Sequence, residues 1–242
     1  MKALILAAGY GTRLYPLVQD TPKAFLEVKG RTLIGHIVDK IKGVEGLEEI
    51  LVVTNNKFYS DFKNWAQHQP FNIRVINDGT DTPEQRLGSI GDIHFALTQY
   101  AFSDDLLVVG SDNLFNFNLG DFFKFAKQKS HSATIGLYDI GDISQAHKFG
   151  VVSVDKDKKI TLFEEKPEKP QSTLIAMCFY YFPRETVDLT FQYVKEVEKA
   201  DRAGDYIKWI AERHSVYGFT FSGKWYDIGS IESYKDAQEN FS

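Results

Sequence analysis

Hydrophobic positions in the first half of the chain follow two alternating spacings. Four short apolar runs have the length of buried strands, and they cover residues 3–8, 49–54, 73–76 and 105–109. After the first run, apolar residues recur at the i, i+3, i+4 and i+7 spacing of an amphipathic helix, at Ile34, Ile37, Val38 and Ile41. A similar stripe follows the second run, at Phe58, Phe62 and Trp65. Strands that alternate with helices predict a parallel, doubly wound α/β sheet.

The rest of the chain carries further strand and helix patterns, with no linker, repeat or low-complexity run between them. Strands are expected at residues 24–28, 133–138, 149–154, 160–165, 174–182 and 216–221, and helices at 119–126 and 185–199. Asp205 is expected to cap a helix that reaches His214, and Ser230 a closing helix. Ser89 is expected to cap the helix that carries Ile90. We therefore expect one domain over residues 1–242.

Composition and charge exclude several classes of protein. Hydrophobic residues make up 43% and charged residues 25% of the 242 residues, which is ordinary for a globular protein. The net charge of −5 argues against a nucleic-acid partner, and no apolar run reaches the ~18 residues of a membrane span. The N-terminus lacks the pattern of a signal peptide, so a cytoplasmic location without membrane contact is expected. The single cysteine, Cys178, predicts a packed core thiol, and the histidines lack zinc-site spacing.

The first apolar run ends in a glycine-containing loop with two cations nearby. Gly9 and Gly11 allow a sharp turn and a close approach of backbone amides to a triphosphate. Arg13 and Lys23 can stabilise negative charge that develops on phosphoryl oxygens. The loop is neither a dinucleotide fingerprint, because Leu14 stands at the third glycine position, nor a Walker loop. It predicts phosphoryl or nucleotidyl transfer.

Asp112 follows the fourth apolar run. In a parallel sheet, ligands bind beyond the carboxyl ends of the strands, so Asp112 is expected beside the glycine-containing loop. A hard cation such as Mg²⁺ takes one or two carboxylates together with phosphate oxygens. Asp112 is therefore a candidate Mg²⁺ ligand.

Five motifs, in order along essentially the whole chain, resemble the signature of the sugar-1-phosphate nucleotidyltransferases. They are Gly-Tyr-Gly-Thr-Arg-Leu at 9–14, Pro-Lys at 22–23, Ser-Asp-Asn at 111–113, Glu-Lys-Pro at 165–167 and Trp-Tyr-Asp-Ile-Gly at 225–229. Phe149 and Gly150 are also similar to a sugar-facing Tyr-Gly element of that family, with Phe149 in place of the tyrosine. The resemblance implies a Rossmann-like three-layer α/β/α sandwich with a mixed, mostly parallel central sheet.

The resemblance also implies a reaction. A nucleoside monophosphate would pass from a nucleoside triphosphate to a sugar 1-phosphate, by in-line attack on the α-phosphorus and release of pyrophosphate. Arg13 would hold the pyrophosphate, Lys23 and Lys166 the reacting phosphates, and Asp112 and Asp227 the Mg²⁺ ion. The residues implied in nucleotide binding are Leu6, Ala7, Ala8, Gly9, Gly11, Thr12, Gly88 and Ser111, and those implied in sugar phosphate binding are Gly150, Glu165 and Lys166.

Recognition of the base departs from the family pattern. Residues 87–89 are similar to an element at which the nucleobase approaches the backbone of Gly88, but Pro83 stands where the family usually has a base-reading glutamine. The backbone near Gly88, or the side chain of Gln85 or Thr80, would then read the base, although helix capping alone also explains Gln85. The expected substrates are dTTP, UTP or CTP, with dTTP and glucose 1-phosphate as the first expectation.

Two other interpretations remain open from the sequence. A cytidylyltransferase that acts on phosphocholine or another phospho-alcohol shares the opening loop, and its acceptor pocket would favour aromatic side chains around a cationic head. A regulatory module would bind the nucleotide without turnover. Glu165 and Lys166 favour a sugar phosphate as the acceptor, and the retained carboxylates and cations favour an enzyme. The oligomeric state, including a homo-oligomer, is left open.

Overall fold

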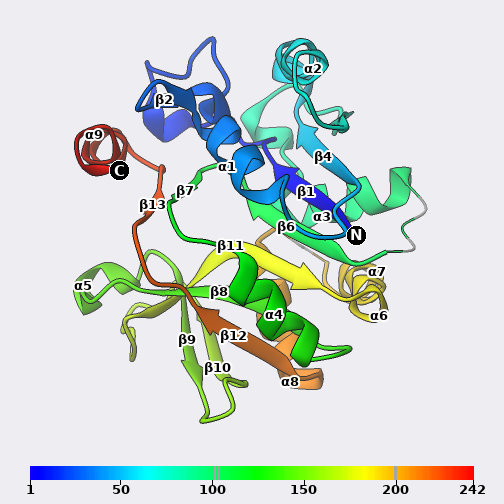
Figure 1. Cartoon of the computed structure of the whole chain (residues 1–242), viewed down its shortest axis with the longest axis vertical. Helices are drawn as coiled ribbons and strands as arrows, with labels where there is room; N and C mark the ends of the chain where they lie inside the picture. The colour runs from blue at the N-terminus through cyan, green and yellow to red at the C-terminus, as the bar shows by residue number, and fades with distance from the viewer. Residues whose placement is uncertain (101, 103, 199–200) are drawn as a thin grey trace.

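The computed structural model describes residues 1–100, 102, 104–198 and 201–242. Over these residues a nine-stranded mixed sheet forms the centre of the molecule (Figure 1). Its strands are β1 (Lys2–Leu6), β4 (Glu49–Thr54), β5 (Ile73–Asn77), β6 (Leu106–Gly110), β8 (Ala133–Asp139), β9 (Gly150–Val154), β10 (Ile160–Glu165), β11 (Leu174–Phe182) and β12 (Val216–Thr220). The main path runs in the order β10-β9-β11-β6-β1-β4-β5, and β8 joins β11 to β12.

The half of the sheet that carries the glycine-containing loop is parallel. Strand β1 lies between β4 and β6 and is parallel to both, and β4 is also parallel to β5. Strand β11 then reverses the direction, since it is antiparallel to β6, β8 and β9. Strands β1, β4 and β6 are almost entirely buried, as their continuous apolar sequences require for strands covered on both faces.

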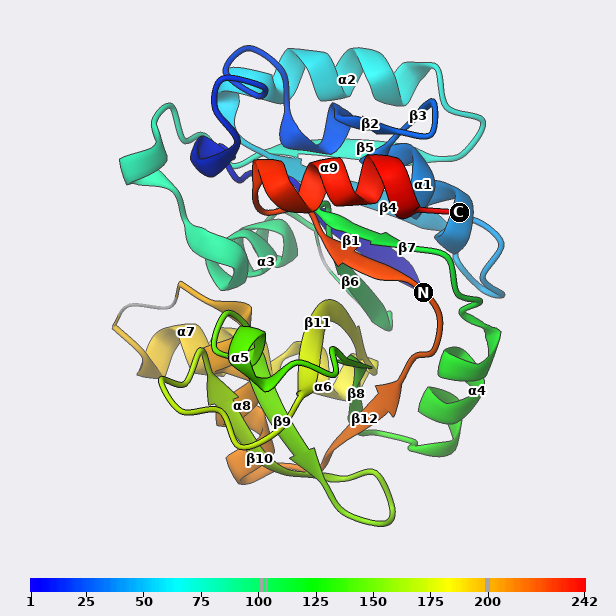
Figure 2. The same ribbon diagram turned by 90° about the vertical axis from the view of Figure 1, so that its left-hand side faces the viewer.

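Helices cover both faces of the sheet, which Figure 2 shows edge on. One face packs on α1 (Leu33–Ile41), α2 (Tyr59–Gln67) and α4 (Gly120–Gln128), and the other on α3 (Gly88–Gln99), α7 (Leu189–Glu196) and α8 (Ala203–Arg213). Alternate residues of β1 enter the two cores, Ala3 and Ile5 on one side and Leu4 and Leu6 on the other. The expected three-layer α/β/α architecture is therefore confirmed.

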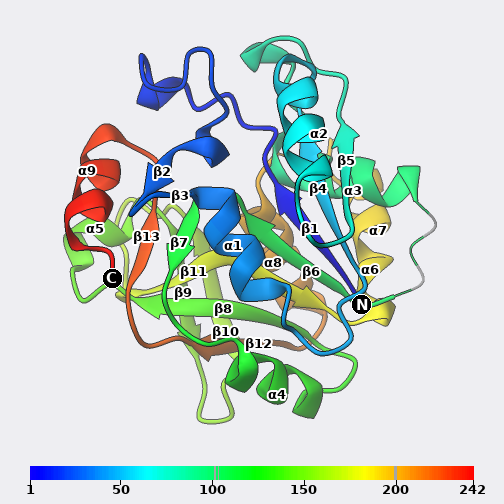
Figure 3. The same ribbon diagram turned by 45° about the horizontal axis from the view of Figure 1, so that its top comes forward.

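A smaller core lies beside the glycine-containing loop. It joins Leu14 and Val18 to α9 (Ile231–Asn240), which packs against the two-stranded sheet of β7 (Asn113–Phe115) and β13 (Trp225–Asp227) (Figure 3). Ser230 caps α9 as expected, because its hydroxyl accepts a hydrogen bond from the Ser233 amide at 3.2 Å. The remaining elements are β2 (Glu27–Val28), β3 (Arg31–Thr32), α5 (Ile143–Ala146) and α6 (Arg184–Val187), with 3₁₀ turns at Thr12–Leu14, Lys23–Phe25, Asn56–Phe58 and Pro83–Gln85.

Two expected elements differ from the structure. The expected strand at 24–28 begins as the 3₁₀ turn Lys23–Phe25, closed by a hydrogen bond from the Phe25 amide to the carbonyl of Pro22, and only β2 pairs. The expected helix at 185–199 is two helices, α6 and α7, separated at Asp188, and residue 199 lies outside the described residues. None of the described helices is long and apolar enough to cross a bilayer.

The capping of α3 and α8 also differs from expectation. Asp205 lies inside the first turn of α8, whose N-cap is Arg202, and Ser89 lies inside α3. The Ser89 hydroxyl instead accepts a hydrogen bond from the Ala203 amide at 2.7 Å, at the start of α8. In return the Asp201 carbonyl accepts hydrogen bonds from the Ile90 amide, at 3.3 Å, and from the Ser89 hydroxyl, at 3.2 Å. Each helix thus receives its cap from the other, which fastens α3 to α8.

Candidate active site

A cavity of about 380 Å³ opens at the carboxyl ends of β1 and β6, between the N-termini of α3 and α8. Many of the residues expected at the site line it: Leu6, Ala8, Gly9, Arg13, Gly88, Asp112, Gly150, Glu165, Lys166 and Asp227. Five expected residues do not line the cavity. Lys23 is connected to it by an ion pair with Asp112, and the other four are close in sequence to residues that line it: Ala7, Gly11, Thr12 and Ser111. The sheet edge therefore gathers most of the predicted site.

The glycine-containing loop is held in a fixed shape. Gly11 adopts a φ of +64°, and a Cβ atom there would lie 3.0 Å from the Cγ2 atom of Val18. The Ala8 carbonyl accepts a hydrogen bond from the side-chain amide of Asn55 at 2.9 Å. Gly9, in contrast, has no atom within 4 Å of the position of a Cβ atom, so its backbone is open to a ligand in the cavity. The loop is therefore held by its packing at Gly11 and is accessible at Gly9, where the phosphates are expected.

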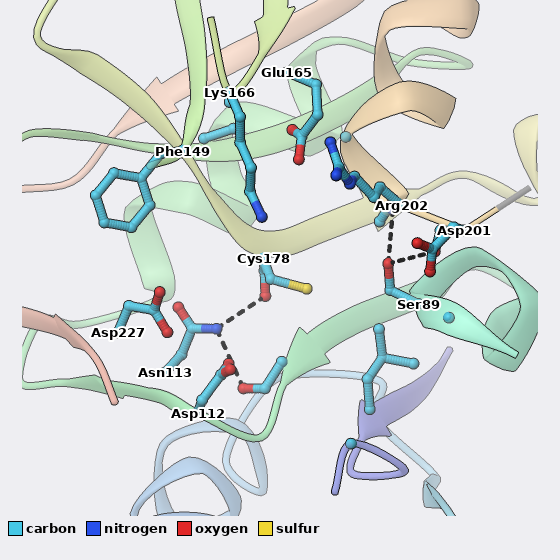
Figure 4. Close-up of a pocket in the computed structure, with 18 of the residues that line it drawn as sticks. Ser89, Asp112, Asn113, Phe149, Glu165, Lys166, Cys178, Asp201, Arg202 and Asp227 are labelled. Atoms are coloured by element: carbon cyan, nitrogen blue, oxygen red, sulfur yellow. Dashed lines mark hydrogen bonds between the residues drawn. The ribbon is translucent and has the colours of Figure 1, made fainter. Parts of the chain in front are cut away.

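Asp112 and Asp227 are brought together by the pairing of β7 with β13. Asp227 lies opposite Asn113 in this pairing, and the Ile228 amide donates a hydrogen bond to the Asp112 carbonyl at 3.0 Å. The indole N–H of Trp225 donates to the Asn113 side chain at 2.7 Å, which fixes the pair of strands. Two carboxylates from segments more than a hundred residues apart thus share one wall of the cavity (Figure 4).

The two carboxylates have opposite pKa shifts. Burial raises the pKa of Asp112, but the ammonium of Lys23, 2.7 Å away, and the charge of Arg13 outweigh it, so the pKa lies below its usual value. Burial and the neighbouring charge of Asp112 raise the pKa of Asp227 to about 6. Near neutral pH both groups are therefore largely ionised. Two carboxylates completed by phosphate oxygens and water suit Mg²⁺, and no group of three or more metal-ligating side chains occurs among the described residues.

Across the cavity, Lys166 and Glu165 follow each other at the end of β10. The Lys166 side chain extends toward Asp112 and Asp227, and Phe149 lies beside it (Figure 4). The Phe149 ring also packs against Trp225, with 5.6 Å between the ring centroids. Burial raises the pKa of Glu165, and the charges of Lys166 and Arg202 oppose this shift. The cavity thus has cations and carboxylates on both walls.

Several lining residues were not expected from the sequence. Asn113, Lys148 and Trp225 lie beside expected residues, but Arg86, Asp92, Asp201 and Arg202 carried no motif and reach the cavity through the contact between α3 and α8. Cys178 is packed as expected but also lines the cavity, and burial raises the pKa of its thiol to about 12. It is therefore an unreactive thiol.

The residues considered for base recognition occupy different environments. Gly88 has a φ of +76°, and the Asp201 carboxylate lies 2.1 Å from the position of a Cβ atom there, so the approach of Asp201 alone requires a glycine. Thr80 is buried and hydrogen-bonded to Asp78, and Gln85 accepts a hydrogen bond from the Asp81 amide at 3.0 Å. Neither Thr80 nor Gln85 lines the cavity.

Comparison with known proteins identifies the family. The family model described as nucleotidyl transferase matches residues 2–242. This chain belongs to the nucleotidyl transferase family. It is 28% identical, over 231 residues, to the bifunctional protein GlmU of Methanocaldococcus jannaschii, and the match covers 95% of this chain and 51% of GlmU. The chain thus spans about half the length of this relative.

Solved structures share the fold of this nucleotidyl transferase. A protein assigned as a glucose-1-phosphate thymidylyltransferase from Bacillus anthracis, in complex with sucrose, superposes with a TM-score of 0.85 and 24% identity, and covers 99% of this chain and 94% of its own. A UDP-glucose pyrophosphorylase complexed with UDP-glucose superposes with a TM-score of 0.82 and 21% identity, and covers 99% and 97%. These structures confirm the expected fold, and the family model confirms that the chain is a nucleotidyl transferase, as the motifs predicted.

Proposed function

We propose that this nucleotidyl transferase transfers a nucleoside monophosphate from a nucleoside triphosphate to a sugar 1-phosphate. The observation that carries the proposal is the arrangement across one cavity, where Lys166 and Glu165 face Asp112 and Asp227 (Figure 4). Two substrates that both carry phosphate require two kinds of group. One wall offers carboxylates suited to a cation, and the other offers an amine for the second phosphate. Two structures with the same fold are named as a glucose-1-phosphate thymidylyltransferase and as a UDP-glucose pyrophosphorylase, and these names agree with the proposal.

In the proposed reaction, an oxygen of the sugar phosphate forms a bond to the α-phosphorus, and the bond from that phosphorus to the bridging oxygen breaks. Arg13 and the amides near Gly9 bind the oxygens of the triphosphate, and Lys166 orients the attacking phosphate. The electron pair of the broken bond leaves with pyrophosphate. The attacking phosphate is already ionised, so no protein base is needed.

Asp112 and Asp227 are the residues that would hold Mg²⁺. When bound, this ion supplies positive charge that neutralises the developing charge on the phosphoryl oxygens. Lys23 forms an ion pair with Asp112 and so keeps this carboxylate ionised and oriented toward the cavity. We further propose that residues 1–242 act as one domain in the cytoplasm.

The test is pyrophosphate release in a panel that crosses dTTP, UTP, CTP, GTP and ATP with several sugar 1-phosphates and with phosphocholine. Phe149 and Trp225 offer an aromatic wall that a cationic head could use, so turnover with phosphocholine alone would favour the cytidylyltransferase. Removal of Mg²⁺ with EDTA is expected to abolish turnover.

Asp112→Asn is expected to lower kcat by ~10²-fold or more, because it removes one carboxylate of the cation pair. The matched control is Asp121→Asn, which changes an exposed aspartate of α4 away from the cavity. Both variants should keep the thermal stability of the wild type within a few degrees. Full activity of Asp112→Asn, or of the wild type in EDTA, would contradict the metal-dependent reaction.

A further inference from the structure

Asp92 is a buried carboxyl group that the proposed reaction leaves unused. It lies one turn along α3 from Gly88, is only 6% exposed and lines the cavity. Its Oδ1 atom is buried without a hydrogen-bond donor among the described residues. A buried carboxyl group without a hydrogen-bond partner destabilises the folded protein. At a cavity wall, a bound ligand or a proton shared with a neighbouring group can remove this penalty.

Asp78, which follows β5, is the neighbour with which Asp92 can share a proton. Its Oδ1 atom accepts hydrogen bonds from the amide and hydroxyl of Thr80, at 2.7 and 2.8 Å, while its Oδ2 atom is buried without a donor. The carboxyl groups of Asp78 and Asp92 lie within hydrogen-bonding reach of each other. Two carboxyl groups can hydrogen-bond only if one of them carries a proton.

The proton belongs to Asp92 at neutral pH. Burial, and then the charge of Asp78, raise the pKa of Asp92 to about 8, with a further contribution from Asp201. The other charged side chains of this part of the cavity lining are Arg86 and Asp201, which pair at 3.6 Å, and Arg202. Asp92 therefore donates its proton to Asp78 and keeps its second oxygen as a hydrogen-bond acceptor.

The position of Asp92 indicates which part of a nucleotide it meets. The triphosphate is assigned to the end of the cavity with Arg13 and the metal-binding carboxylates, and the acceptor to the wall with Lys166. Asp92 lies on the remaining wall, where a carboxyl pair would repel phosphate. The nucleoside is the component left for the space between the opening loop and α3.

We propose that Asp92 selects the nucleobase, by accepting a hydrogen bond from the N3–H group of a uracil or thymine ring. The first N–H groups of α3 have no partner within the helix. Apart from that of Ile90, which donates to the Asp201 carbonyl, they can donate to a flanking carbonyl of the ring. Cytosine presents a lone pair at N3 and would oppose the Asp92 oxygen. The inference rests on the proposed nucleotidyl transfer, since it assigns the base of the same substrate.

The test measures binding of UTP, dTTP and CTP by calorimetry with Mg²⁺ and without any acceptor, so that it does not depend on which acceptor the enzyme uses. The wild type is expected to bind UTP and dTTP at least about tenfold more tightly than CTP. This ratio corresponds to the gain of one hydrogen bond with UTP or dTTP and the repulsion between the Asp92 oxygen and the N3 lone pair of CTP. Asp92→Ala is expected to reduce this ratio to about threefold or less.

Asp92→Asn is the informative companion variant. Its side-chain amide can donate to Asp78, and its carbonyl can accept from N3–H, so it reproduces the neutral acid. It should keep the preference for UTP and dTTP that Asp92→Ala loses. Asp121→Asn is the matched control, because it makes the same change at an exposed aspartate of α4 away from the cavity.

Four outcomes would overturn the inference. The first is a wild type that prefers CTP or binds none of the three nucleotides. The second is an Asp92→Ala variant that weakens binding of all three nucleotides equally. The third is a change in the ratio of UTP to dTTP affinity in Asp92→Ala, which would indicate recognition of the ribose, and the fourth is a loss of preference in the control Asp121→Asn. If the base preference behaves as expected but no sugar phosphate is turned over, the proposed acceptor is wrong and the role of Asp92 stands.

Discussion

Replacement of Asp92 by asparagine is expected to stabilise the protein more as the pH rises. The folded chain holds a proton on Asp92 up to a pKa of about 8, whereas the unfolded chain releases it near the usual value of about 4. Between these values the folded state binds more protons than the unfolded state. The free energy of unfolding of the wild type therefore decreases as the pH rises through this window.

The magnitude follows from the same shift. One proton of difference changes the free energy of unfolding by at most about 1.4 kcal/mol per pH unit. Asparagine binds no proton and can donate its amide hydrogen to Asp78 in the same place. The advantage of Asp92→Asn over the wild type should thus grow from pH 5 to pH 8, to several kcal/mol at most, and level off above about pH 8.

The assay is unfolding in urea at pH 5, 6, 7, 8 and 9 and constant ionic strength, for the wild type, Asp92→Asn and the control Asp121→Asn. The difference between Asp92→Asn and the wild type is the quantity of interest, because shared effects of pH cancel in it. A difference that stays constant with pH, or that shrinks as the pH rises, would refute a proton shared by Asp78 and Asp92.

Two further predictions concern the acceptor wall. Lys166→Ala should raise the KM for the sugar phosphate much more than the KM for the nucleotide, whereas Arg13→Ala should mainly impair turnover of the nucleotide. Steady-state kinetics that show equal effects on both substrates would contradict this assignment of the two residues. Gly204→Ala should raise the KM for the acceptor by about tenfold, because its Cβ atom would lie 2.0 Å from the Glu165 carboxylate. Gly43→Ala is the control, since a Cβ atom there has no neighbour within 4 Å, and it should leave the KM unchanged. An unchanged KM in Gly204→Ala would show that Glu165 can move without loss of acceptor binding.

The sequence predicted the parallel half of the sheet and the opening loop because both depend on local patterns. The buried runs of β1, β4 and β6 and the glycines at 9 and 11 need no distant partner to be recognised. The caps of α3 and α8 were assigned wrongly for the opposite reason. Capping rules assume that a polar residue serves the helix it precedes, whereas Ser89 serves a helix that begins 114 residues later.

The candidate site shows the same division. Asp112, Asp227 and Lys166 stand in compact motifs, and the cavity brings them together. Asp92 has no motif, and in the sequence it is one of several polar residues on its helix, like Ser89, His94 and Thr98. Its environment arises only when Asp78, from a loop after another strand, packs against it. Groups whose chemistry depends on a distant neighbour could not be recognised from spacing alone.

The pairing of β7 with β13 has a consequence for the order in which the protein gains its activity during synthesis. The opening loop, Lys23 and Asp112 all lie in the first half of residues 1–242, and domains tend to fold from the N-terminus as they emerge from the ribosome. Asp227 arrives only with β13, close to the last helix. A nascent chain can therefore present one carboxylate and its lysine long before it can present the pair. If both carboxylates are needed for turnover, nucleotide chemistry is withheld until the ribosome has nearly finished the domain.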